Sequence, residues 1–104
     1  MPGAAVAADH ALVEPLTFTA PLERDPDGTW WYLHVPGGIR TALKAHERRG
    51  VIAVTATIGG TTWPGSLLPW ADGSAQLTVS ARIRSREGLA LGDRVAVSLL
   101  PRER

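Results

Sequence analysis

Several residue types and patterns are missing from this chain, and each absence removes a class of chemistry. The 104 residues contain no cysteine, which excludes disulfides, thiolate metal sites and cysteine nucleophiles. No apolar run approaches the roughly 20 residues that a membrane-spanning helix needs. The opening residues lack a basic leader followed by a leucine-rich stretch, so they do not resemble a secretory signal. These absences favour a cytoplasmic protein without membrane association.

Charge and length set further limits. Eleven basic residues against ten acidic ones give a formal net charge of +1, well short of the basic excess that is typical of nucleic-acid-binding domains. The three histidines, His10, His34 and His46, lack the spacing of metal ligands, so we expect no metal site and no cofactor. The length predicts one domain, over residues 16–100, with a flexible tail at 1–15 and a short tail at 101–104.

Hydrophobic periodicity predicts a mainly β protein. Alternating apolar residues predict strands over residues 16–22, 29–35, 51–58, 75–79 and 94–100. Another strand is expected after the Gly59-Gly60 turn, interrupted by Pro64 and Gly65. Helical spacing predicts two short helices, over residues 39–49 and 81–87.

The sequence also contains an internal repeat. Placing the middle of the chain over its last third aligns Leu33 with Leu77 and, after a one-residue gap, Ala56 with Leu99. Each half then consists of a strand, a short helix and a returning strand. Two such units that bury their apolar faces against each other predict a closed double-split β-barrel with pseudo-twofold symmetry. Chance similarity between two short apolar patterns is the alternative.

Two resemblances to known families bear on this fold. The second unit reads Leu-Thr-Val-Ser-Ala-Arg-Ile-Arg and then Gly-Leu-Ala-Leu-Gly-Asp-Arg-Val-Ala-Val, which resembles the half-barrel of AbrB and MazE type bacterial regulators. In those proteins two short chains pair to form one barrel, so the resemblance implies that one chain holds both halves here.

The second resemblance extends over residues 16–100. Its motifs are Phe-Thr-Ala-Pro-Leu, the Trp-rich strand ending in Val-Pro, Ala-Thr-Ile-Gly-Gly-Thr, and Gly-Asp-Arg-Val. Together they resemble a bacterial family of unknown function that is often fused to bacteriocin-protection (OmpD-associated) segments. This resemblance assigns no chemistry to particular residues.

A hydroxyl-rich loop with tryptophans is the first candidate site. Hydroxyl side chains surround Trp63 in residues 61–66, a composition that suits a small polar pocket for a small molecule or a peptide. The alternative is turn chemistry, with Trp63 filling one end of the barrel. The strand at 29–35 places three further polar or aromatic residues on one face, where they could meet a ligand or a second subunit. The predicted ligand-binding residues are Trp30, Tyr32, His34, Thr61, Thr62, Trp63, Ser66 and Trp70.

Two other functions stay open at this point. Arg82, Arg84 and Arg86 on the second helix could contact phosphates as part of an AbrB-like DNA-binding regulator, although interleaved charges on a short helix are usually a solvated face. A cofactor-free enzyme with its site in the barrel mouth is the third possibility, but no base lies near Ser66 in sequence. We expect a small-molecule or peptide partner before a nucleic acid, and a monomer or a homodimer.

Overall fold

The structure of the protein is a computed structural model, in which residues 14–102 are described. The tail expected at 1–15 therefore lies almost wholly outside the described residues, as do residues 103 and 104. The strands are β1 (Leu16–Arg24), β2 (Trp31–Val35), β3 (Glu47–Arg48), β4 (Val51–Ile58), β5 (Thr61–Pro69), β6 (Ala75–Thr78) and β7 (Arg94–Pro101). The helices are α2 (Gly37–Ala42), the single 3₁₀ turn η1 (Lys44–His46) and α3 (Ala81–Glu87).

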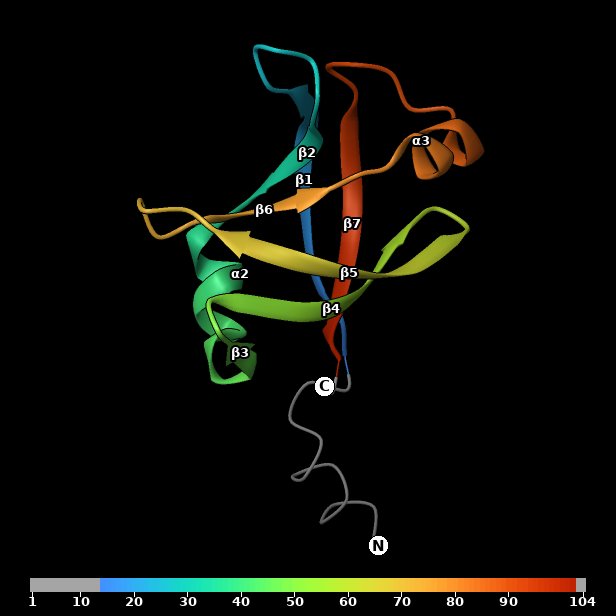
Figure 1. Cartoon of the computed structure of the whole chain (residues 1–104). Coiled ribbons are helices and arrows are strands. Elements are labelled where there is room, and N and C mark those ends of the chain that lie inside the picture. The colour runs from blue at the N-terminus through green and yellow to red at the C-terminus, as the bar shows by residue number, and fades with distance from the viewer. Residues whose placement is uncertain (1–13, 103–104) are drawn as a thin grey trace, which may run out of the picture.

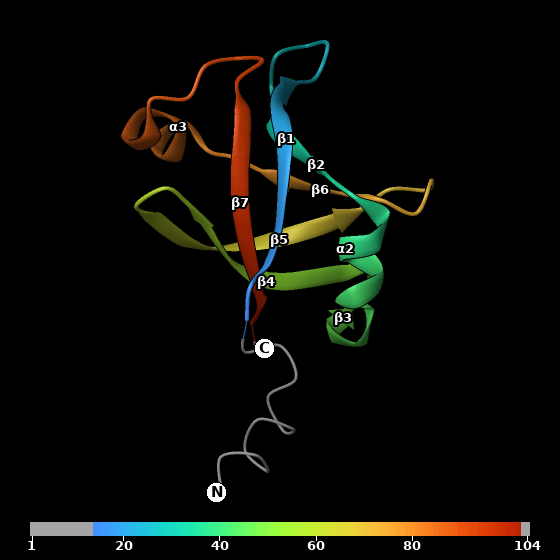
Figure 2. The ribbon, with the colours of Figure 1, turned by 180° about the vertical axis from the view of Figure 1, so that it is seen from behind.

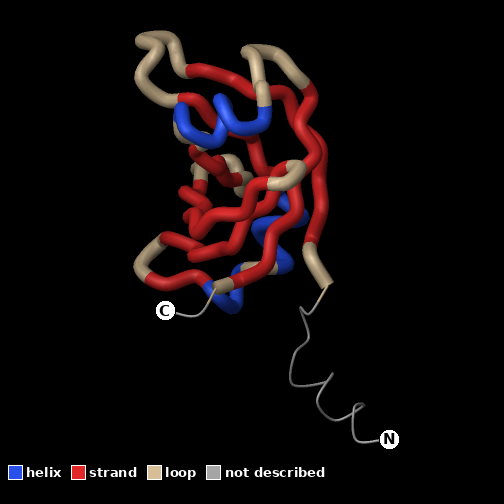
Figure 3. The backbone as a smooth tube through the Cα atoms, turned by 90° about the vertical axis from the view of Figure 1, so that its right-hand side faces the viewer, coloured by secondary structure: helices blue, strands red, loops and turns tan. Residues whose placement is uncertain are grey.

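Six of these strands form a closed antiparallel barrel (Figures 1 and 3). Hydrogen bonding connects the strands in the order β4-β5-β6-β2-β1-β7, and β7 pairs back onto β4 to close the ring. The two-residue strand β3 pairs with the first two residues of β4, Val51 and Ile52. The helices α2 and α3 lie on opposite sides of the barrel (Figure 2). The predicted mainly β fold, with a closed barrel and two short helices, is confirmed.

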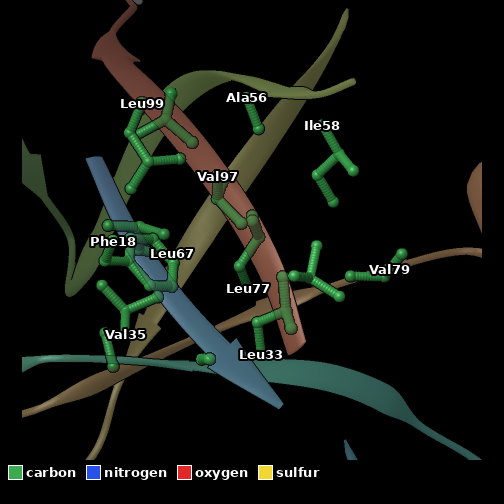
Figure 4. Close-up of a cluster of buried hydrophobic side chains, with 14 of the residues drawn as sticks. Phe18, Leu33, Val35, Ala56, Ile58, Leu67, Leu77, Val79, Val97 and Leu99 are labelled. Carbon is green, nitrogen blue, oxygen red and sulfur yellow. The ribbon is translucent and has the colours of Figure 1, made fainter. Parts of the chain in front are cut away.

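The core fills the inside of the barrel, because every second residue of each strand points inward. Strand β4 contributes Val54, Ala56 and Ile58, each at most 4% exposed. The two central leucines, Leu33 and Leu77, are completely buried and face each other across β2 and β6. Figure 4 shows Leu33, Leu77 and Ala56 among the side chains that converge from strands distant in sequence.

The first predicted helix is shorter than expected. Helix α2 ends at Ala42, and the chain then forms η1 and the strand β3 instead of continuing as a helix to residue 49. Arg49 and Gly50 both have positive φ angles, of 55° and 76°, which builds a two-residue hairpin turn into β4. Strand pairing with β4 therefore replaces the last turns of the predicted helix. None of the helices in residues 14–102 has the length and apolarity needed to cross a membrane.

Strand β5 differs from the strand predicted after the Gly59-Gly60 turn. It runs without interruption through Pro64 and Gly65, where a break was predicted. Strand β4 pairs with residues 61–67 of β5, whereas β6 pairs only with residues 67–69. Pro64 therefore lies where one edge of β5 has no strand partner, and a proline is tolerated at such a position.

Candidate functional site

The predicted ligand-binding residues divide between the two ends of β5. Thr61, Thr62 and Trp63 begin this strand, whereas Trp70 follows its last residue. A strand of this length extends about 27 Å, so these residues cannot line one small pocket. Each end of β5 instead faces one of the helices and borders its own hollow.

The first of these, here called the β5–α3 hollow, has a volume of about 500 Å³. It lies between the start of β5 and helix α3. Its lining residues are Gly60, Thr61, Thr62, Trp63, Pro64, Ser80, Arg82, Ile83 and Arg86. The same space is therefore bordered by the hydroxyl-rich loop and by Arg82 and Arg86, which the sequence analysis assigned to the nucleic-acid alternative.

Trp63 lies beside a glycine on its own strand. It is half-buried and packs against the barrel core. A Cβ atom on Gly65 would lie 3.2 Å from Trp63 Nε1 and 3.2 Å from a methyl group of Leu77. Glycine at position 65 therefore leaves the space in which the indole ring rests between the core and the hollow.

Helix α3 presents its arginines in two different ways. Ser80 caps the helix by accepting a hydrogen bond from Ile83 N at 3.4 Å, and Ile83 is buried. Arg84 is engaged within the fold, because its Nη1 donates to Val79 O at 2.7 Å and its guanidinium lies over a tryptophan ring. Arg82 and Arg86, by contrast, are exposed, border the hollow and have no hydrogen bond or ion pair within residues 14–102.

A carboxylate connects α3 to the β4–β5 turn. Thr61 Oγ1 donates a hydrogen bond of 2.5 Å to Glu87 Oε2. The same carboxylate lies against Gly59, whose φ angle is +57° and where an added Cβ would overlap Glu87 Oε1. On the neighbouring position, the Thr62 hydroxyl bonds the Thr57 hydroxyl at 2.9 Å. This wall of the hollow is therefore fixed by side-chain contacts.

The other end of β5 borders a second hollow, here called the α2–Trp70 hollow, of about 410 Å³. Its lining residues are Arg40, Thr41, Lys44, Trp70, Ala71 and Gly73. Trp70 contacts His34 with ring centroids 4.6 Å apart and Tyr32 in an edge-on arrangement at 5.7 Å. Its Nε1 donates to Gln76 Oε1 at 2.9 Å. Trp70 therefore packs against Tyr32 and His34, two of the three residues of the face predicted for the strand at 29–35.

A chain of hydrogen bonds extends from His34 into the β5–β6 turn. Ser74 Oγ donates to Asp72 Oδ1 at 2.5 Å and lies 2.7 Å from His34 Nε2. Because Ser74 has a single hydroxyl proton, His34 Nε2 must be the donor in the second bond. The imidazole therefore does not act as a base toward this serine, as a serine nucleophile requires. The Ser74 hydroxyl and the Ser74 backbone N–H both lower the pKa of Asp72.

Four predicted residues line neither hollow. Tyr32 and His34 contact Trp70 but do not border the space beside it. Trp30 is 54% exposed and precedes β2, and Ser66 is half-buried on β5 opposite Ala53. The sequence reasoning did not include Arg40, which bonds the Trp70 carbonyl, or Lys44, which borders the same hollow, because only tertiary packing brings this segment to Trp70. Among residues 14–102, no three histidine, aspartate or glutamate side chains gather closely enough to hold a metal ion.

The sequence of this chain matches a known domain family. The sequence matches a domain of unknown function (DUF1905) over residues 18–99, from within β1 to within β7. The chain belongs to the DUF1905 family. Both hollows are bordered only by residues of the DUF1905 match. A search of curated proteins finds no match to this DUF1905 domain.

Proposed function

We propose that this DUF1905 domain binds a small anionic molecule in the β5–α3 hollow. The observation that supports this is the pair Arg82 and Arg86, which lie one helical turn apart on α3 and border a hollow with hydroxyl groups opposite. Side chains four residues apart on a helix lie on the same face. Two guanidinium groups at that spacing suit a phosphate or a carboxylate, which they bind through charge-assisted hydrogen bonds.

The charges around the hollow favour a small ligand over a nucleic acid duplex. Arg84 is engaged with a backbone carbonyl and a tryptophan ring, so within the described part of the chain α3 offers Arg82 and Arg86 to a ligand and not a row of three arginines. Glu87 adds a negative charge at the rim, although its Oε2 is engaged with Thr61. Exposed ion pairs each contribute only about 0.2–1 kcal/mol. Two such contacts contribute at most about 2 kcal/mol, so we expect weak binding of a simple anion, with a dissociation constant of roughly 30 mM or more.

The test is an amide NMR titration of the isotope-labelled full chain with inorganic phosphate at constant ionic strength. Saturable shifts are expected in residues 60–64 and 82–86. Arg82→Gln and Arg86→Gln should each weaken binding by about threefold to fivefold, and the double variant should remove saturation. Arg94→Gln is the matched control, because Arg94 is exposed at the start of β7, away from the lining of the hollow.

Two results of this titration would count against the proposal. Equal weakening by Arg94→Gln would indicate a general response to positive charge. Shifts with a short DNA duplex that exceed those with phosphate, and that disappear as salt rises, would favour the nucleic-acid alternative.

We also infer that the barrel consists of two halves related by a pseudo-twofold axis. Two register pairs support this: Leu33 pairs with Leu77, and Ala56 pairs with Leu99. These are the residues that the internal repeat makes equivalent, and a twofold axis brings equivalent residues of antiparallel strands opposite each other. Strand neighbours agree, because β1 adjoins β2 and β7 as β5 adjoins β6 and β4.

Fragment complementation tests this inference. Chains ending at residue 59 and beginning at residue 60 should associate into a one-to-one barrel with native-like amide shifts. Fragments that stay unfolded when mixed, or that form only aggregates, would argue against a barrel built from these two halves.

A further inference from the structure

We propose that the α2–Trp70 hollow is a second ligand site, distinct from the β5–α3 hollow, and that it takes a small aromatic monocarboxylate. Two cations on α2 and η1 supply the anion-binding side. Arg40 donates from Nη1 to Trp70 O at 2.9 Å and to Ser74 O at 3.1 Å. Both bonds use one nitrogen, and the Nη2 and Nε donors of this anchored guanidinium make no hydrogen bond to any residue between 14 and 102. Lys44 is exposed and has no hydrogen bond or ion pair within residues 14–102.

The aromatic wall of this site is fixed before any ligand arrives. Trp70 contacts His34 and Tyr32 through its ring and Gln76 through Nε1. Its backbone carbonyl accepts the bond from Arg40, and its backbone N–H donates to Ser74 O at 2.8 Å. Fixing the ring in this way reduces the conformational entropy that a ligand would lose on binding. An aromatic ring packs on such a surface better than an alkyl group does.

The size and charge of the hollow select a particular kind of anion. A volume of about 410 Å³ that is open to solvent accommodates a single ring with one substituent. Asp72 lies between two lining residues, and its carboxylate is held by the backbone N–H and hydroxyl of Ser74. Its negative charge next to the site opposes a dianion such as phosphate and leaves a monocarboxylate as the better match to Arg40 and Lys44.

Three related probes separate the contributions of ring and charge. The isotope-labelled full chain is titrated with benzoate, with cyclohexanecarboxylate and with benzamide, and the tryptophan indole and backbone amide signals are followed by NMR. Benzoate should shift the Trp70 indole signal and the amides of residues 40–44 in a saturable way. The two other probes should bind at least about threefold more weakly, because each lacks one of the two groups that the site recognises.

Matched variants locate the binding. Lys44→Gln should weaken benzoate binding beside Trp70 by at least about threefold, whereas Arg94→Gln, on β7 and outside the lining of both hollows, should leave it unchanged. The proposal is overturned if benzoate gives no saturable shift of the Trp70 indole signal at millimolar concentration, if its shifts are confined to residues 60–64 and 82–86, or if benzamide binds equally well. Equal loss with both variants would also overturn it. Failure here with intact phosphate binding in the β5–α3 hollow leaves the proposed function standing.

Discussion

Gly59 allows a sharp test of how α3 is attached to the barrel. Its φ angle of +57° and the position of Glu87 against its α carbon both oppose a side chain. In Gly59→Ala, the left-handed backbone costs about 1 kcal/mol. The new methyl group also displaces Glu87 from Thr61, and a charged hydrogen bond that is partly exposed contributes about 1 kcal/mol. We expect a loss in the free energy of unfolding of about 2 kcal/mol, which lowers Tm by roughly 10 °C.

Urea unfolding followed by tryptophan fluorescence measures this loss, and two controls divide it into its causes. Gly60→Ala should change stability by less than about 0.5 kcal/mol, because an added Cβ there meets nothing within 4 Å. In a Glu87→Ala background, Gly59→Ala should cost only the backbone term of about 1 kcal/mol. An undiminished cost in that background would refute the contact between residue 59 and Glu87 as the cause.

Three further predictions concern titration and packing. Asp72 has a lowered pKa in the folded state because Ser74 bonds to it; its contribution to stability is present above pH 3.8 and is lost as pH falls through the folded pKa. Unfolding curves of Asp72→Asn and of the unchanged protein should therefore differ at pH 7 and converge in acid. Burial, and then the charge of Glu23, raise the pKa of the sole tyrosine, Tyr32, above 10.0. The midpoint of its ultraviolet titration should therefore lie above that pH and move back toward it in Glu23→Gln. Stability should fall as pH rises through the folded pKa. Leu77→Ala should cost about 2–5 kcal/mol in urea unfolding, because this side chain is completely buried in the core.

Local patterns predicted most of the elements of this fold. The alternation in residues 51–58 matches β4, and the Ser80 cap with Gly88 at the far end gives α3 its bounds. These signals are strong because they act over a few residues. The helix predicted to residue 49 was wrong because Glu47 pairs with Ile52, a contact in a hairpin that the helical spacing does not reveal.

The candidate site was harder to predict because it depends on which segments meet. Thr61 and Trp70 are close in sequence, and an extended strand separates them in space. Thr61 and Glu87 are far apart in sequence, and a hydrogen bond joins them. Composition indicated that hydroxyls, tryptophans and arginines were available, but only the closure of the barrel brings Arg86 to the hydroxyl loop.

The pairing of β1 with β7 has a consequence for chain connectivity. Leu16 lies opposite Leu99, so the first and last strands of the barrel begin and end side by side. A short linker between them, with a new opening at the Gly59-Gly60 turn, would preserve all six strand pairs of the barrel and exchange the order of its halves. The six strands form a closed ring. We therefore expect a chain with its termini moved to this turn to fold into the same barrel.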